Sequence, residues 1–252
     1  MVVKTEAVVL KTVKYGDTSK IITAFTREYG KLSLIAKGAR TSRSKFVSIL
    51  NPMSCIQAVF YLKESRDIHL LSDASLSRVH KSIVEDPKKT MTGFAMLDAL
   101  NTAVHTREPH PVLFDHLVEA LDVLDLAEQS PVNSLVAFLI ALLREIGYGL
   151  KLDACVKCGG ELDREPLAFE SQFGGFVCGR CSSSETGPVV AMNQLKALRW
   201  LERPSPGAWS SLSLEPMESL KIVHLLAGHL CRHVPGARRL KSLSLLESTV
   251  VG

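Results

Sequence analysis

The sequence predicts an α+β multidomain protein, with an N-terminal five-stranded OB-fold barrel followed by an α-helical bundle that carries an inserted four-cysteine zinc knuckle. Three observations support this prediction. Apolar residues follow a two-residue period over about the first 75 positions and a helical period after Ser77, and two Cys-x-x-Cys pairs interrupt the helical part. We expect the units to span 1–78, 79–150 together with 190–252, and 151–189.

The N-terminal unit contains five short segments that are rich in Val, Ile, Thr and aromatic residues and are separated by turn residues. None of the intervening segments can form a helix long enough for a parallel crossover, so a small closed barrel is favoured, an OB-fold first and an SH3-like barrel second. The segment "GARTSRSKF" from Gly38 to Phe46 is predicted to be a longer basic loop. The expected strands are 5–16, 20–30, 31–39, 53–63 and 68–75.

Helical periodicity dominates the rest of the chain. One apolar stripe is expected to run along 90–106, and the segment at 131–149 is so apolar that we expect it to be buried centrally. A short basic tail, 237–249, closes the chain. The stripe on 90–106 is expected to contain Met91, Phe94, Leu97, Leu100 and Val104. The other expected helices are 110–130, 192–203 and 215–236.

The positive charge is concentrated in the N-terminal segment. Residues 1–50 contain ten Lys and Arg against three acidic residues, whereas residues 51–252 contain twenty against twenty-three. This asymmetry predicts that a polyanionic partner docks on the barrel.

The N-terminus and the longest apolar run indicate where in the cell the protein is expected. Lys and Glu interrupt every short apolar run at the N-terminus, which is not typical of a signal or transit peptide. The longest apolar run, Leu135 to Leu143, is far shorter than the ~18 residues of a membrane span. We therefore expect a soluble, cytoplasmic protein, in which paired thiols are metal ligands more often than disulfides.

The two Cys-x-x-Cys pairs have the spacing of a zinc ribbon. Random placement of six cysteines would give about 0.14 such pairs in the whole chain, yet two occur within one short stretch. Four thiolates complete a tetrahedron and leave no position for water or substrate, so the expected Zn²⁺ is structural. Gly159, Gly160 and Gly179 let the backbone bend around the metal. The expected ligands are Cys155, Cys158, Cys178 and Cys181.

Enzymatic alternatives lack their motifs. Neither cysteine pair lies in a thioredoxin-like context, and the chain has no His-x-Glu or Cys-x-Glu of a zinc deaminase, no P-loop and no nucleophile elbow. His229 and His233 have a metal-compatible spacing but no third ligand, and they more simply complement the dipole of their helix. We expect a protein without enzymatic activity or a nucleotide cofactor. A metallohydrolase remains as an alternative and would require a ligand other than cysteine.

The basic loop is the main candidate for binding nucleic acid. Its cations would follow the phosphates of a strand, and one or two aromatic side chains, Phe46 or Tyr29 first, are expected to stack on bases. The predicted phosphate contacts are Lys37, Arg40 and Arg43, with Lys20 and Lys45 second. Lys11, Lys14, Arg27 and Lys31 lie near them in the sequence and are expected to add to the same field.

Three stretches resemble the bacterial recombination mediator family RecO. They are "AVVLKTVKYGDTSKIITAFTREYGKLSLIAKGAR" near the N-terminus, "REIGYGLKLDACVKCGG" with "FGGFVCGRC" around the cysteines, and "GARRLKSLSLLE" near the C-terminus. The resemblance covers essentially the whole chain.

The resemblance implies more than the residue pattern does. Members of this family bind single- and double-stranded DNA through the OB-fold, anneal complementary strands, engage the acidic C-terminal tail of single-strand binding protein, and act with RecR to load RecA. It also implies a cytoplasmic, nucleoid-associated location.

The alternative function is that of an RNA-binding protein with an OB-fold and a zinc ribbon. A preference for RNA over DNA of equal length would favour this alternative.

Overall fold

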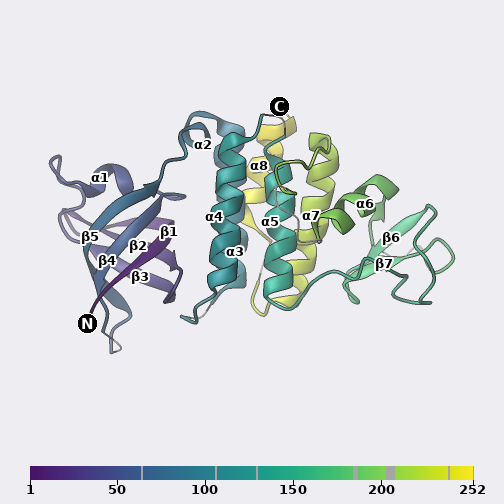
Figure 1. Cartoon of the computed structure of the whole chain (residues 1–252), viewed down its shortest axis with the longest axis horizontal. Coiled ribbons are helices and arrows are strands. Elements are labelled where there is room, and N and C mark those ends of the chain that lie inside the picture. The colour runs from purple at the N-terminus through teal and green to yellow at the C-terminus, as the bar shows by residue number, and fades with distance from the viewer. Residues whose placement is uncertain are drawn as a thin grey trace.

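The computed structural model describes residues 1–63, 65–105, 107–128, 130–183, 187–202, 208–237 and 239–251. A β-barrel lies at one end of the molecule, helices occupy the middle, and a small sheet lies at the other end (Figure 1). The strands are β1 Val2–Tyr15, β2 Ser19–Thr26, β3 Gly30–Ala36, β4 Cys55–Tyr61, β5 Ile68–Arg78, β6 Leu167–Glu170, β7 Gly175–Val177 and β8 Val189–Val190. The helices are α1 Phe46–Ile49, α2 Lys81–Glu85, α3 Pro87–Ala103, α4 Pro111–Leu126, α5 Val132–Glu145, α6 Met192–Leu201, α7 Pro216–His233 and α8 Lys241–Val251.

The N-terminal barrel has the topology of an OB-fold, which confirms the prediction. Its strands close in the order β1-β2-β3-β5-β4, with β3 and β5 parallel and the other pairs antiparallel. The long strand β1 closes the barrel because its first half pairs with β4 and its second half with β2. A register shift between Val9 and Lys11 marks the change of partner. The short helix α1 follows the basic loop and was not expected.

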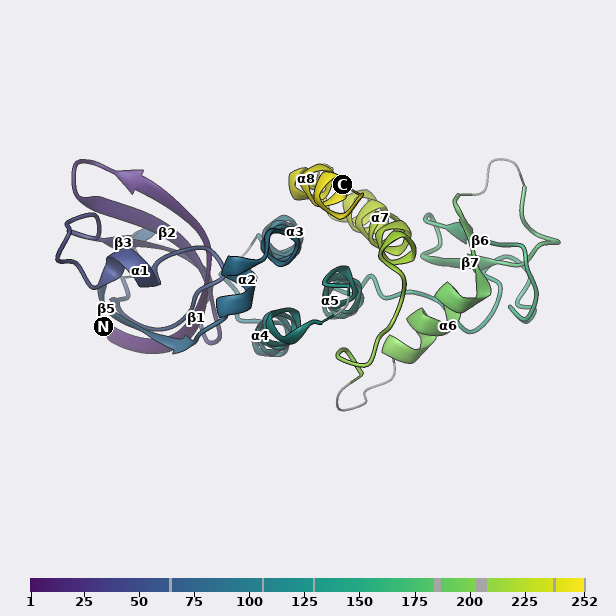
Figure 2. The same ribbon diagram turned by 90° about the horizontal axis from the view of Figure 1, so that it is seen from above.

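The central bundle is built around α5. Every residue of this helix from Val132 to Leu143 is buried, as its apolar sequence predicts. The expected apolar stripe on α3 was partly wrong, because α5 and α8 both pack on this helix and lie on different sides of it (Figure 2). Ala95, Met96 and Ala99 are buried, whereas the side chain of Phe94 is 36% exposed.

The predicted C-terminal tail is wrong, since the segment forms helix α8. Leu240, Leu243 and Leu246 are buried at a spacing of three residues, and α8 lies beside α3 (Figure 2). The side chain of Asp98 on α3 accepts hydrogen bonds from the backbone N–H and the hydroxyl of Ser242, at 3.1 and 2.9 Å. This carboxylate therefore satisfies donors in the first turn of α8.

The barrel and the bundle share one core. Val8, Leu10 and Phe25 point out of the barrel and pack with the buried side chains of the helices. Arg27 on the rim of the barrel forms an ion pair with Asp115 of α4 at 2.8 Å. A Cβ atom at Gly30, whose φ is +63°, would lie 2.4 Å from the backbone oxygen of Glu108, so only glycine fits here.

The small sheet at the far end has the order β7-β6-β8 and carries the cysteines on its flanking loops. Phe169 and Phe176 of this sheet pack edge to face and join the same core as the helices. The division at 1–78, 79–150 with 190–252, and 151–189 stays a prediction. Among the described residues, no helix is long and apolar enough to cross a lipid bilayer.

Candidate nucleic-acid interface and metal centre

The basic loop of residues 37–45 connects β3 to α1 and lies against the turn between β1 and β2. The backbone N–H of Arg40 donates to the carbonyl of Thr18 at 2.8 Å. The guanidinium of Arg40 donates to the carbonyls of Gly16 and Asp17, both at 3.1 Å. Arg40 therefore fixes two loops of the barrel to each other, a structural task that the sequence did not reveal.

The predicted contact residues differ in how far the protein neutralises them. Lys37 and Arg43 are exposed and make no side-chain hydrogen bond or ion pair with a described residue. Lys45 instead forms a short ion pair with Asp73, and its ammonium lies 5.5 Å from the ring centroid of Phe46. Lys37 and Arg43 are thus the cations of this loop most available to an external anion.

The register between β1 and β2 brings a second pair of cations together. Lys14 and Lys20 are direct cross-strand partners, so their side chains leave the same face of the hairpin. Like charges at directly opposite positions destabilise a sheet. A bound anion would relieve this repulsion. Lys20 was a predicted contact, and the spacing of both lysines from the Gly16-Asp17 turn could have identified Lys14 as its partner.

Two nearby cations do not belong to the loop surface, contrary to expectation. Arg27 is engaged by Asp115 and by Glu6, the latter at 3.4 Å. Lys31 donates to the carbonyl and the side-chain oxygen of Asn101 on α3, both at 3.2 Å. Both residues face the bundle, because the outer side of β2 and β3 docks there.

The aromatic prediction was wrong for Phe46, and for Tyr29 it stays a prediction. Phe46 is buried because α1 turns it into the barrel core, and Tyr29 is half-buried and packs edge to face on Phe60. The exposed aromatic side chains of the barrel are Tyr15 (55%) and Tyr61 (45%). Tyr15 lies at the end of β1, next to the turn between β1 and β2, and its exposure makes it the better candidate for stacking on a base, although its side chain points to the opposite face from Lys14.

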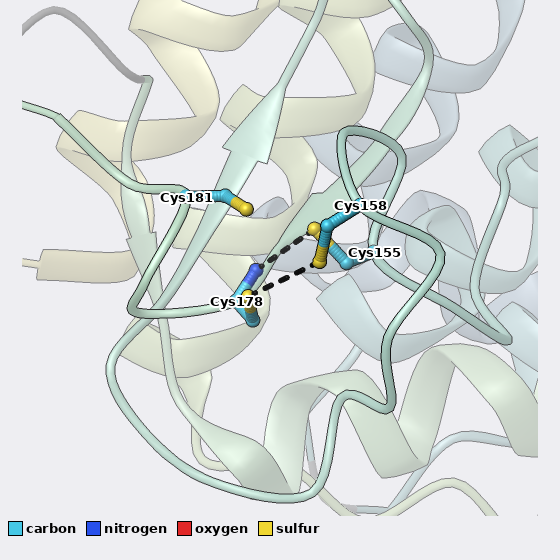
Figure 3. A group of neighbouring side chains, drawn as sticks. All are labelled: Cys155, Cys158, Cys178 and Cys181. Carbon is cyan, nitrogen blue, oxygen red and sulfur yellow. Dashed lines mark hydrogen bonds between the residues drawn. The ribbon is translucent and has the colours of Figure 1, made fainter.

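The four predicted metal ligands meet at one point (Figure 3). The Sγ atoms of Cys155, Cys158, Cys178 and Cys181 all lie within 4.8 Å of one another, and those of Cys158 and Cys178 are 3.8 Å apart. A tetrahedral site with Zn–S bonds of about 2.3 Å requires S–S separations of about 3.8 Å. The donor set and its spacing therefore fit a four-coordinate metal ion such as Zn²⁺.

Backbone donors prepare this cluster for a cation. Burial alone would raise the pKa of Cys155, but N–H groups of Cys178, Cys158 and Lys157 outweigh it and lower the pKa to about 6. The backbone N–H of Cys181 lowers the pKa of Cys178. The side-chain hydrogen bond with Cys158 is the main cause that raises the pKa of Cys181 to about 12, because this thiol keeps the proton that it donates. A divalent cation would displace such protons and bind the four thiolates.

The loops around the cysteines are shaped for tight turns, as the glycines predict. Gly159 adopts a φ of +71°, and its N–H donates to the carbonyl of Cys155 at 2.8 Å. In the second pair, the N–H of Cys181 donates to the carbonyl of Cys178 at 2.9 Å. Each pair thus lies in a turn closed by a backbone hydrogen bond and presents two thiols to the centre.

His229 and His233 attach the cysteine unit to α7, and neither belongs to the cluster of four possible metal ligands found among the described residues. His229 Nε2 donates to the carbonyl of Tyr148 at 3.1 Å, and His233 Nε2 donates to that of Ser171 at 2.9 Å. His229 is 2% exposed and packs edge to face on Phe169. Burial lowers the pKa of His229, so the folded protein holds this imidazole neutral.

We expect His229→Gln to reduce the acid sensitivity of the fold. Because the pKa of His229 is lowered in the folded state, the unfolded chain takes up a proton first, and stability falls as the pH drops below about 6.5. The glutamine amide can still donate to Tyr148 but does not titrate. Urea unfolding at about pH 7.5 and about pH 5.5 should show a smaller loss for the variant. Burial also lowers the pKa values of His69 and His116, so some loss remains. An equal loss of unfolding free energy in the variant and the unmodified protein would show that protonation of His229 does not contribute to the acid sensitivity.

The cysteine cluster and the basic loop lie at opposite ends of the molecule (Figures 1 and 2). Helices α3, α4, α5, α7 and α8 stand between the barrel and the sheet of β6 and β7 in both views. The cluster therefore cannot share a binding surface with the loop of residues 37–45.

Comparison with known proteins decides the family. The model for the recombination protein O N-terminal region matches residues 1–80, and the model for its C-terminal region matches residues 84–244. The chain belongs to the RecO family. The DNA repair protein RecO of Prosthecochloris aestuarii is 31% identical over 245 residues, covering 93% of this chain and 92% of that protein. The RecO proteins of Anaeromyxobacter sp. strain K and Rubrobacter xylanophilus are each 31% identical and cover 97% and 94% of this chain, and 96% and 94% of their own lengths.

The family resemblance of the sequence is thereby confirmed across both halves of the chain. The boundary between the two RecO models falls at 80–84, where β5 has ended and α2 begins. The loop with Lys37 and Arg43 lies within the N-terminal match, and the four cysteines lie within the C-terminal one.

Proposed function

We propose that this chain is a non-enzymatic recombination mediator in DNA repair. In this proposal the barrel binds single- and double-stranded DNA, the protein anneals complementary strands, and together with RecR it helps to load RecA onto strands coated with single-strand binding protein. Membership of the RecO family supports the general role in repair and recombination.

One observation carries the DNA-binding part of the proposal. The turn between β1 and β2 and the loop of residues 37–45 are joined through Arg40, and they carry cations that no described carboxylate neutralises. Lys14, Lys20, Lys37 and Arg43 form this set, which we call the loop cations. Lys45 contributes less, because Asp73 already pairs with it. The turn between β1 and β2 is one of the two loops with which OB-folds usually bind oligonucleotides, and the loop of residues 37–45 lies against it.

The proposed mechanism is electrostatic. The loop cations would neutralise phosphates of a bound strand and release its condensed counterions. A strand whose charge is partly neutralised repels a complementary strand less, so annealing becomes faster without any covalent step. No nucleotide is required for this mechanism.

We propose that the metal is structural Zn²⁺ held by Cys155, Cys158, Cys178 and Cys181. A closed site of four thiolates would stabilise the small sheet and would leave no position for a substrate. This supports a mediator rather than a metallohydrolase. The proposed partners beyond DNA are RecR and the acidic C-terminal tail of single-strand binding protein, and the proposed location is the cytoplasm, in association with the nucleoid.

Strand annealing tests the proposal directly. Complementary DNA strands coated with single-strand binding protein should anneal faster when this protein is added, and removal of the acidic tail should reduce the effect. RNA strands of equal length serve as the comparison. Failure to anneal in every condition would refute the mediator proposal, and a clear preference for RNA would favour an RNA-binding function instead.

A further inference from the structure

A cleft of about 890 Å³ lies at the edge of the contact between the outer face of the barrel and the bundle. Strands β1 and β3 line one side, and α3 with the segment that leads into α8 lines the other. The helices α3 and α8 that form the second side lie side by side (Figure 2). The cleft therefore combines residues from the two ends of the chain.

The cleft is positively charged. Its charged lining residues are Lys11, Lys31, Arg239 and Lys241, against the single carboxylate of Asp98. Asp98 already accepts the two hydrogen bonds from Ser242 at the start of α8. His105 is the remaining titratable group of the lining. Among the described residues, none of the four cations forms an ion pair, so their charge is left for an external anion.

Lys31 is a partly buried cation of this cleft that has no charged partner among the described residues. Its ammonium is held only by the uncharged oxygens of Asn101, at 3.2 Å. Burial lowers the pKa of Lys31, which means that the site destabilises the charged ammonium. A phosphate beside it would reverse this cost.

The cleft also offers an aromatic ring. Phe94 of α3 lines it and is 36% exposed, although the periodicity of the helix predicted that it would face the core. An exposed ring among cations is the combination with which proteins bind single strands, since bases stack on the ring while phosphates meet the charges.

The outer face of the barrel leads into this cleft. Lys31 pairs across the sheet with Phe25, and Lys11 pairs with Thr23 in the neighbouring outward row. Further along β1 the outward side chains are Val13 and Tyr15, which are 48% and 55% exposed. Lys14 and Lys20 lie in the opposite row of this hairpin, with Ile22 and Ala24. An extended strand held by them would therefore pass around the turn between β1 and β2 and then follow the outward face to the cleft.

We propose that the cleft binds the continuation of a single nucleic-acid strand that is held first by the loop cations, with Arg239 and Lys241 meeting phosphates and Phe94 stacking on a base. This inference rests on the proposed DNA-binding function. It adds a second contact region, built from the C-terminal segment, to the one on the barrel loops.

The test compares two lengths of single-stranded oligo(dT) in a fluorescence-anisotropy titration. One oligonucleotide has about 6 nucleotides, which one OB-fold can hold, and the other has about 30. The double variant Arg239→Ala with Lys241→Ala should bind the longer one about 10- to 25-fold more weakly at about 0.1 M salt and the shorter one as the unmodified protein does. Phe94→Ala should weaken binding of the longer one on the order of fivefold.

The matched control is Lys221→Ala with Arg232→Ala, which removes the same two residue types from exposed positions on α7 and should change neither affinity. Thermal unfolding should show that each variant is folded at the temperature of the titration. The cleft proposal is overturned if the double variant binds both lengths normally, or if it weakens both equally. Absence of any DNA binding by the unmodified protein would instead refute the proposed function.

Discussion

Replacing Lys37 and Arg43 together by Ala should weaken the binding of single-stranded DNA on the order of 25-fold at about 0.1 M salt. Each phosphate neutralised on a single strand contributes about 0.7 to the slope of log K against log salt, so the loss of two contacts lowers that slope by about 1.4. The two side chains are exposed and have no described partner, so their removal should leave the stability of the barrel unchanged. Titrations at three salt concentrations measure both the affinity and the slope.

Arg40 is left in place in this variant for a structural reason. Its guanidinium holds the turn at Gly16 and Asp17, so Arg40→Ala would move the loop as well as remove a charge. The control is again Lys221→Ala with Arg232→Ala on α7. An unchanged affinity and an unchanged salt slope for Lys37→Ala with Arg43→Ala would remove the loop from the proposed DNA interface.

The second large effect is expected from Cys158→Ser. Cys158 is the exposed member of the cluster, so its replacement costs little packing and reports mainly on the metal. Structural zinc contributes an apparent free energy of about 10–16 kcal/mol in small zinc-finger peptides, so a site that loses one of four ligands should lose much of its stabilisation. We expect less than one zinc per chain, poor solubility, and faster hydrogen exchange in residues 151–183 than in α5.

Cys231→Ser provides the control for this experiment, because it makes the same chemical change on α7, outside the cluster. It should retain the full zinc content, measured by atomic absorption. DNA affinity per folded molecule should be the same in both variants, since the cluster and the loop cations lie at opposite ends (Figure 1). A Cys158→Ser protein that keeps its fold but specifically loses DNA binding would contradict the structural role of the metal.

Local patterns in the sequence predicted most of the fold. Alternating apolar residues predicted the strands of the barrel, and the unbroken apolar run predicted the buried helix α5. The cysteine spacing predicted the cluster of four thiols. Each of these features depends on residues close together in the chain or on a spacing set by one kind of ligand. The same rule could have identified α8, because Leu240, Leu243 and Leu246 already show its buried side.

The residues whose environment was predicted wrongly owe that environment to the way in which separate elements pack together. Arg27 and Lys31 look like surface cations until the bundle covers the outer side of β2 and β3. Phe46 is buried because α1 follows the basic loop, and Phe94 is exposed because α8 and α5 take other sides of α3. No periodicity within one element contains that information.

The shared core of barrel and bundle determines whether the barrel can be produced as a separate fragment. Val8, Leu10 and Phe25 are covered only while the helices are present, and the same continuous core reaches Phe176 beside the cysteines. A fragment that ends near residue 78 would expose this apolar surface to water and would tend to aggregate. The OB-fold of this chain is thus a recognisable module in topology, and yet it depends on the bundle to cover the apolar side chains of its outer face.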